Sequence, residues 1–318
     1  MGQCPRIQPS GGWTEGITVR TASLCKTFLR GGALAVASAA TIGCLALPAT
    51  AASSSIPTAP KSASLAAAVP AAVRSAGLHV ALDATYAPDE FVAADGKTIV
   101  GMDADLAKAI GQVLGLKVVL TNATFDTIIP SLQSAKFNLG MSSFTDTKAR
   151  EKVVDFIDYF QAGEGYYVKT GSSYKPNGLA ALCGHSVSVE SGTTEQTDAQ
   201  SQKAACAKAG KGAVNVLSFP DQNSANLAVS SGRAQVGFAD SQVAGYIVAQ
   251  SKGEFANSGK PFGVAPYGIA VPKGLKLTTS ISGAVTQLIH DGIYAKILSK
   301  WGISAGALTA TKINGATS

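Results

Sequence analysis

Histidine, tryptophan and charged residues are scarce in this sequence, and their scarcity excludes several kinds of function. The three histidines are scattered and none has metal-ligand spacing to a cysteine, which argues against a metal centre. The chain also lacks a glycine-rich phosphate loop, a nucleophile elbow and any run of Lys and Arg interleaved with aromatics. We therefore expect no metal, no other cofactor and no nucleic-acid partner.

Charge is low and only slightly basic. Charged residues make up 14% of the 318, and the formal net charge is +6. Residues 1–51 hold four basic residues and one acid, so the remaining chain has a charge of +3. Hydrophobic residues reach 46%, which is ample for two packed domains of ordinary size.

The N-terminus has the pattern of an export signal. Lys26 and Arg30 precede an apolar run over residues 32–47, and small residues around Ala51 follow as a cleavage site. The run is too short to remain as a membrane-spanning helix. We predict a signal peptide over residues 1–51 and an exported protein that is extracellular, on the cell surface or periplasmic.

Five cysteines are present, and three of them (Cys4, Cys25 and Cys44) lie in or before the predicted leader. The remaining pair, Cys183 and Cys206, predicts one disulfide in an exported chain. By the chain-entropy relation, closing that loop stabilises the fold by about 3 kcal/mol. Cys44 leaves an alternative open, because TIGC resembles a lipoprotein cleavage box with Thr in place of the usual Leu, and a lipid there would anchor the protein to a membrane.

Residues 52–75 are rich in Ala, Ser and Pro and predict a flexible tether that ends in a weak helix at most. From Leu78 onward, short apolar runs alternate with segments of helical period. Strands are expected at 78–82, 118–120, 138–141, 187–189, 214–217, 235–238 and 263–271. Such βα alternation is typical of an α/β fold with a mostly parallel sheet, in which ligands bind beyond the carboxyl ends of the strands.

The stretch MSSFTDTKAREKVVDF, residues 141–156, is the strongest candidate for a ligand site. Three hydroxyl residues open it: Ser142, Ser143 and Thr145. Thr147 is a good N-cap for a helix, which would place Arg150 in the first turn. Helix amides and a guanidinium fork both favour a small carboxylate. The alternative is that Arg150 is a surface residue paired with Glu151 or Asp155.

A second strand-to-helix turn of this kind follows Glu190. Thr193 or Thr194 is expected to cap a helix that reaches toward Ala209. Farther along, Asp240 ends a strand, where it can supply a charge to a site, cap the helix that runs through Val243 and Ile247, or do both.

These residues resemble one known family, the extracytoplasmic solute-binding proteins of polar amino-acid ABC importers. The likeness covers 78–301, and five motifs occur in the family's order: Thr85-Tyr86-Ala87-Pro88, Gly101-Met102-Asp103-Ala104-Asp105-Leu106, Phe125-Asp126 with Ile129-Pro130-Ser131-Leu132, Thr147-Lys148-Ala149-Arg150 before Val154-Asp155-Phe156, and Ser191-Gly192-Thr193-Thr194. The resemblance implies a two-lobed, periplasmic-binding-protein-like (type II) fold with a ligand cleft between the lobes. It places lobe 1 at 76–163 plus 266–318 and lobe 2 at 164–265.

The resemblance also implies the residues that hold the backbone groups of an amino acid. Arg150 would bind the α-carboxylate, assisted by Ser143 and Thr145 and, from the other lobe, by Thr194. Asp240 would bind the α-ammonium. A zwitterion requires such a facing pair of charges in a partly dry cleft.

For the ligand side chain, the resemblance implies stacking on Tyr86 and Phe125, although both residues are equally suited to plain core packing. Asp83 matches a position at the floor of the pocket. Glu190 lies beside the second turn, and together with Asp83 it would favour Arg, Lys, ornithine or a similar cation; a solvent-facing Glu190 is the alternative. Asp89 replaces the family's usual aromatic after the proline, so one wall of the pocket differs.

The predicted function is capture of a free amino acid and its delivery to the permease of an ABC importer, by closure of the lobes over the ligand. The protein would contact the membrane only through that permease or through a lipid anchor on Cys44. The prediction is of a non-enzyme. A cyclohexadienyl dehydratase on the same fold is the alternative, with Glu164 or Glu190 as its general acid.

Overall fold

A computed structural model of the protein describes residues 56–317. The predicted signal peptide and Cys44 lie outside these residues. Helices and strands alternate along the chain. In order they are α1 (Ala63–Ala68), α2 (Ala71–Ala76), β1 (Leu78–Leu82), β2 (Thr85–Tyr86), β3 (Glu90–Val92), β4 (Ile99–Val100), α3 (Met102–Leu114), β5 (Val118–Asn122), α4 (Phe125–Gln133), β6 (Leu139–Gly140), the 3₁₀ helix η1 (Arg150–Lys152), β7 (Val154–Lys169), η2 (Leu179–Leu182), β8 (Ser186–Glu190), α5 (Thr194–Lys208), β9 (Asn215–Phe219), α6 (Gln222–Ser230), β10 (Val236–Asp240), α7 (Ser241–Gln250), β11 (Phe255–Pro272), α8 (Thr278–His290), α9 (Ile293–Trp301) and η3 (Ser304–Gly306).

The strands form one eight-stranded sheet in the order β5-β1-β6-β11-β7-β10-β8-β9 and a small sheet of β2, β3 and β4. β1 pairs in parallel with β5 and β6, and β8 pairs in parallel with β9 and β10. The two long strands β7 and β11 pair antiparallel to each other at the centre of the sheet. The predicted α/β class with parallel strand pairs is therefore confirmed.

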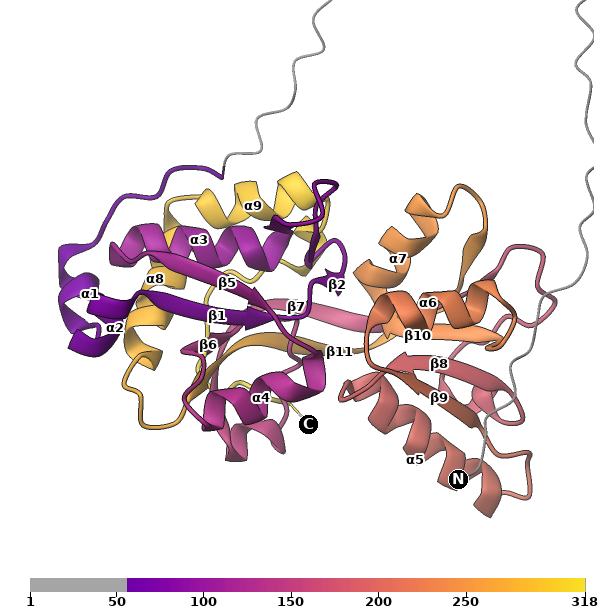
Figure 1. The fold of residues 1–318 in the computed structure, drawn as a ribbon. Coiled ribbons are helices and arrows are strands. Elements are labelled where there is room, and N and C mark those ends of the chain that lie inside the picture. Colours follow the sequence, from indigo (N-terminus) through magenta and orange to yellow (C-terminus); the bar gives the residue numbers. More distant parts are fainter. Residues whose placement is uncertain (1–55, 318) are drawn as a thin grey trace, which may run out of the picture. The chain divides into compact units, whose positions relative to one another are not determined.

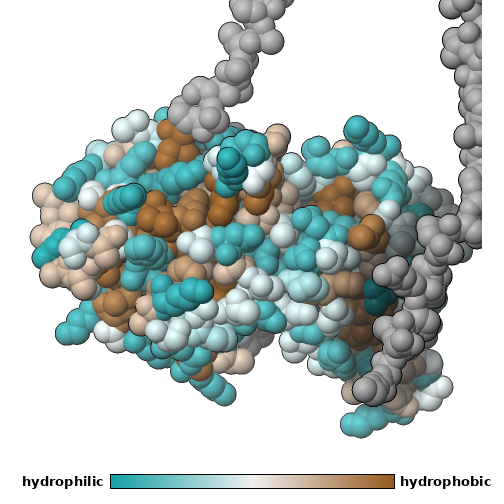
Figure 2. All heavy atoms as spheres, in the orientation of Figure 1, coloured by the Kyte–Doolittle hydropathy of each residue, from teal (hydrophilic) through white to brown (hydrophobic). Residues whose placement is uncertain are grey.

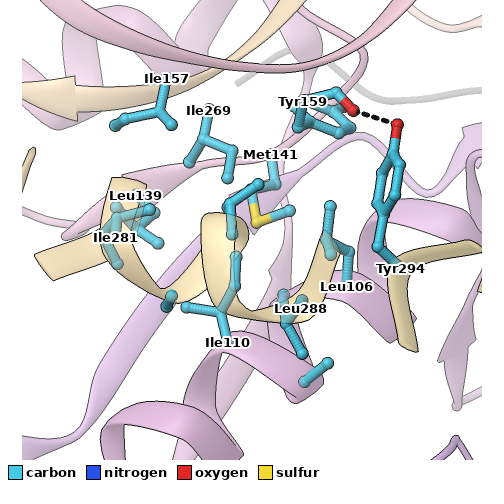
Figure 3. Close-up of a cluster of buried hydrophobic side chains, with 14 of the residues drawn as sticks. Leu106, Ile110, Leu139, Met141, Ile157, Tyr159, Ile269, Ile281, Leu288 and Tyr294 are labelled. Carbon is cyan, nitrogen blue, oxygen red and sulfur yellow. Dashed lines mark hydrogen bonds between the residues drawn. The ribbon is translucent and has the colours of Figure 1, made fainter. Parts of the chain in front are cut away.

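Helices cover both faces of the sheet in two groups, which are joined by β7 and β11 (Figure 1). We call the group around α3, α4, α8 and α9 lobe 1, and the group around α5, α6 and α7 lobe 2. In lobe 1, α3 and α8 bury Leu106, Ile110, Ile281 and Leu288 against the strands, and Tyr294 of α9 donates from its hydroxyl to the carbonyl of Tyr159 at 2.6 Å (Figure 3). A second cluster packs α4 on the other face of the same strands.

Lobe 2 repeats this layering on a smaller scale. α5 packs on one face of its strands through Ala199 and Cys206, whereas α6 and α7 pack on the other through Ala228 and Val243. The predicted disulfide is confirmed: Cys183 and Cys206 are bonded, with their Cα atoms 5.6 Å apart, and they tie η2 to α5.

The chain passes from lobe 1 to lobe 2 inside a continuous strand. β7 packs on the lobe 1 core up to Ala162 and on a lobe 2 core from Tyr166 onward. Gly163, Glu164 and Gly165 are the residues between them. The β11 partner shifts register near here, between Ser258 and Ala265.

The structure corrects the flexible tether predicted for residues 52–75. Within the described part of that segment, α1 and α2 are helical, and Ala59, Val69 and Val73 are buried in the lobe 1 core. The backbone N–H of Ser62 donates to the carbonyl of Val113 at 2.8 Å. Leu65, Val69 and Val73 recur every four residues, and this apolar spacing outweighs the Ala, Ser and Pro composition on which the tether was predicted.

Polar and apolar residues are interspersed over the face of the molecule shown in Figure 2. Five large hydrophobic side chains of the described residues are exposed: Val92, Val153, Leu227, Val264 and Ile313. Among residues 56–317, no helix combines the length and the apolar character needed to cross a membrane.

Candidate functional site

A narrow cavity lies where the two lobes meet. All nine residues singled out as ligand-binding line it, together with three others. The twelve are Asp83, Tyr86, Phe125, Ser142, Ser143, Thr145, Arg150, Glu190, Thr193, Thr194, Glu195 and Asp240. The fold therefore brings the candidate residues of both lobes together around one cavity.

Arg150 lies on the lobe 1 side with its guanidinium over two aromatic rings, 5.5 Å from the ring centres of Phe125 and Phe144. It donates to the carbonyl of Thr145 and, across the cleft, to the carbonyl of Gly192, both at 2.8 Å. A guanidinium has five N–H groups, so three remain for an anion. Burial lowers the pKa of Arg150, whereas the charges of Glu195 and Asp240 raise it.

The alternative of a surface arginine does not hold, because both proposed partners are engaged elsewhere. Glu151 accepts from Lys148 at 2.9 Å, and Asp155 accepts from Lys273 at 2.8 Å. Arg150 faces the cavity instead.

The α-helix predicted after Thr147 is absent. Thr147 does cap a turn, since its hydroxyl accepts from the N–H of Arg150 at 3.2 Å, but only the three-residue η1 follows before β7 begins at Val154. The β-branched pair at 153–154 favours a strand over a continued helix. A helix dipole therefore does not contribute on this side, and the guanidinium carries the positive charge.

Ser143 and Thr145 differ in what they can offer a ligand. The Ser143 hydroxyl donates to Asp89 at 3.0 Å and its N–H donates to Asp103 at 2.9 Å. Because a hydroxyl has one proton to donate, Ser143 forms cavity wall rather than a free donor. The Thr145 hydroxyl meets that of Thr194 across the cleft at 3.3 Å.

On the lobe 2 side, the N-terminus of the 15-residue helix α5 faces the cavity. The prediction of its cap is confirmed, since the Thr193 hydroxyl accepts from the N–H of Gln196 at 3.1 Å. Gly192, just before the cap, approaches lobe 1 so closely that an added Cβ would lie 2.9 Å from the Cβ of Asp126. The helix end favours negative charge here.

Glu195, in the first turn of α5, is the acidic cavity residue that the sequence did not single out. It is 2% exposed, and its Oε1 has no hydrogen-bond partner among the described residues. Burial, with the charge of Asp240, raises its pKa to about 8. In the sequence it looks like an ordinary acid in the first turn of a helix. Its position next to the predicted ligand-binding residue Thr194 is the one signal that could have identified it.

Asp240 binds across the cleft rather than capping α7. Its Oδ2 accepts from the Tyr86 hydroxyl at 2.9 Å, its N–H donates to the same hydroxyl at 3.0 Å, and its side chain caps no helix N–H. Burial raises the pKa of Asp240 to about 7. Tyr86 is thereby fixed at the cavity wall by a polar contact, not by packing alone.

Asp83 and Glu190 interact with each other in the cavity wall, and both are buried, with 3% and 2% exposure. Asp83 accepts from the Thr85 hydroxyl at 2.6 Å and from the Phe125 N–H at 3.1 Å, whereas the Oε1 of Glu190 has no partner among the described residues. Burial and then the charge of Asp83 raise the pKa of Glu190 well above its usual value. The solvent-facing alternative for Glu190 is wrong.

The cavity is therefore rich in acids: four carboxyl groups and one guanidinium line it. Within residues 56–317, no group of three or more His, Cys, Asp or Glu side chains is arranged to hold a metal ion. Unpaired buried carboxylates are costly unless a cation meets them. The arrangement suits a ligand with one negative group for Arg150 and several positive ones for the acids.

Known proteins share this arrangement of elements. Residues 78–304 match the family model of the bacterial extracellular solute-binding proteins, family 3. The chain is 34% identical to the arginine-binding protein ArgT of Corynebacterium glutamicum over 230 residues, which are 72% of this chain and 75% of that protein. Among solved structures, an ancestral arginine-binding protein bound to arginine is 38% identical with a TM-score of 0.65, over 71% of this chain and 97% of the other. An ancestral amino acid-binding protein described as a precursor of cyclohexadienyl dehydratase is 33% identical with a TM-score of 0.65, over 72% and 97% of the two chains.

Proposed function

This chain belongs to the bacterial extracellular solute-binding proteins of family 3, and from that premise we propose that it captures a cationic amino acid outside the cytoplasmic membrane and delivers it to an ABC importer. Arginine is the first candidate, because two of the similar proteins are named for arginine. The observation that carries the cationic preference is the surplus of buried carboxyl groups over guanidinium in the cavity.

Each end of the ligand has a complementary wall in this proposal. Arg150, Thr145 and the N-terminus of α5 hold the α-carboxylate, since all three offer donors or positive potential. Asp240 and Glu195 hold the α-ammonium. Burial raises the pKa of both carboxyl groups, and the charge of Asp240 raises that of Glu195 further, so both favour a cation.

Asp83 and Glu190 receive the cationic end of the ligand side chain. Glu190 has a carboxylate oxygen without a partner among the described residues, and Tyr86 and Phe125, which also line the cavity, flank the aliphatic stem. A guanidinium has a fork of donors that suits two carboxylates better than one ammonium does.

Binding closes lobe 1 (76–163 plus 266–318) and lobe 2 (164–265) over the ligand, because contacts from both lobes are needed to pair the charges of the ligand. The leader over residues 1–51 directs export, with cleavage after Ala51 or lipidation of Cys44 as the two outcomes. We assign no catalytic role: the proteins named above are binding proteins, including the precursor related to the dehydratase.

A thermal-shift screen of residues 52–318, unfolded and refolded to remove carried ligand, tests this proposal. Arginine, lysine and ornithine should raise the melting temperature, by a stabilisation of about 2.7 kcal/mol at a hundred times Kd. A rise confined to uncharged amino acids would reject the cationic preference. No rise with any amino acid, together with consumption of prephenate or arogenate, would reject transport in favour of the dehydratase.

A further inference from the structure

A second contact joins the lobes beside the cavity without lining it. The helix α7 of lobe 2 carries Gln242 and Tyr246 one turn apart, so both lie on the same face of that helix. Neither residue lines the cavity. Each meets lobe 1, and together they form what we call the α7 clasp.

The polar half of the clasp is the amide of Gln242. Its Nε2 donates to Oδ2 of Asp89 at 2.8 Å and to the hydroxyl of Tyr267 at 2.7 Å. Both acceptors are buried in lobe 1, with 0% and 1% exposure. Asp89 otherwise accepts from Ser143, and its Oδ1 has no partner among the described residues. Asp89, which departs from the family's usual aromatic, is thus the anchor that lobe 1 offers to Gln242.

The apolar half is aromatic. The ring of Tyr246 lies 6.1 Å from the ring of Phe91 at 44°, and Phe91 packs edge-on against Trp301 at 5.7 Å. Phe91 lies in β3 of the small sheet, two residues after Asp89, and Trp301 ends α9. Tyr246 therefore meets an aromatic pair that belongs to lobe 1.

We propose that Gln242 and Tyr246 are positioning residues that set how strongly the closed arrangement of the lobes is favoured. Separation of the lobes would break both contacts, whereas the identity of the ligand does not affect them. A contact that distinguishes closed from open without contacting the ligand changes the affinity for every ligand by the same factor. The inference rests on the proposed function, because affinity is its main readout.

The test compares Gln242→Ala and Tyr246→Ala with the unchanged chain and with Gln250→Ala, an exposed glutamine of the same helix. Calorimetry gives the Kd for arginine and lysine, and X-ray scattering gives the radius of gyration without ligand. Loss of a hydrogen bond to a charged group predicts about ten-fold weaker binding for Gln242→Ala. Loss of one aromatic pair predicts about three- to ten-fold for Tyr246→Ala. Each factor should be equal for the two ligands, and Gln250→Ala should match the unchanged chain.

Tyr246→Ala tests the clasp independently of the cavity wall. Gln242 shares its acceptor Asp89 with Ser143, which lines the cavity, whereas Tyr246 contacts Phe91. Affinities within two-fold of the unchanged chain in both variants would overturn the proposal. Losses that differ between arginine and lysine would also overturn it, since they would mean direct ligand contact. If the unchanged chain binds no amino acid, the proposed function is rejected but the clasp can still be tested. In that case a larger ligand-free radius of gyration in Gln242→Ala supports the clasp, and an equal radius rejects it.

Discussion

Replacing Glu190 by glutamine should weaken binding of arginine without weakening the fold. The substitution keeps the size of the side chain and removes its charge. In the structure this carboxyl is buried beside Asp83, with one oxygen unpartnered among the described residues, so its ionised form is disfavoured until a cation is present. A neutral amide at this position removes repulsion from Asp83 and leaves the free energy of unfolding unchanged or raises it.

The loss in affinity can be sized from the same contacts. Truncating one partner of a buried, hydrogen-bonded charge pair costs about 2–5 kcal/mol. Glutamine still offers one acceptor oxygen, so we expect the low end, about 2 kcal/mol or about thirty-fold in Kd. Citrulline, the neutral isostere of arginine, should lose much less, because its side chain has no charge to pair with Glu190.

Calorimetric titration of Glu190→Gln with arginine and citrulline measures this difference directly. Glu254→Gln, an exposed glutamate of the same lobe, is the matched control and should behave as the unchanged chain. Equal affinity losses for arginine and citrulline would refute a charge contact. A large fall in unfolding free energy would show instead that Glu190 supports the fold.

Three further outcomes follow from the site. Arg150→Lys keeps a charge but not the fork, so Kd for the amino acid should rise about hundred-fold in calorimetry, whereas intact affinity would remove Arg150 from the site. The pKa values of Asp240 (about 7) and Glu195 (about 8) are raised in the fold, so the folded state binds more protons than the unfolded one between about pH 4 and 8. The free energy of unfolding without ligand should therefore fall as pH rises through this window, whereas the affinity for arginine should rise and its binding should release protons. A melting temperature that stays constant from pH 5 to 8 would contradict the burial argument. Reduction of Cys183–Cys206 should cost about 3 kcal/mol and lower the melting temperature by about 6–12 °C in calorimetry, with the ratio of arginine to lysine affinity unchanged because the bond lies away from the cavity; a changed ratio would argue otherwise.

The strands and longer helices were predictable because their apolar periods are regular. α5 begins at the predicted cap, Thr193, and the cavity residues were found because five short motifs keep a fixed order. The failures are local sequences decided by tertiary packing. η1 gives way to a strand because β7 pairs with β11, and α1 with α2 folds because lobe 1 supplies an apolar surface. Glu195 and Gln242 carry no sequence signal of their own, since what matters is which residue of the other lobe they face.

The position of β11 constrains how the chain folds during synthesis. β11 lies between β6 and β7 in the sheet, and α8 and α9 pack with α3 in the lobe 1 core. All residues of lobe 2 precede α8, α9 and the part of β11 that lies in lobe 1. During vectorial synthesis or export, lobe 2 can therefore complete its core while lobe 1, although begun first, still exposes the edges of β6 and β7 and the apolar face of α3. The last helices to emerge complete the core of lobe 1, which contains the first part of the fold. A chain interrupted before α8 therefore leaves a folded lobe 2 attached to an incomplete, aggregation-prone lobe 1.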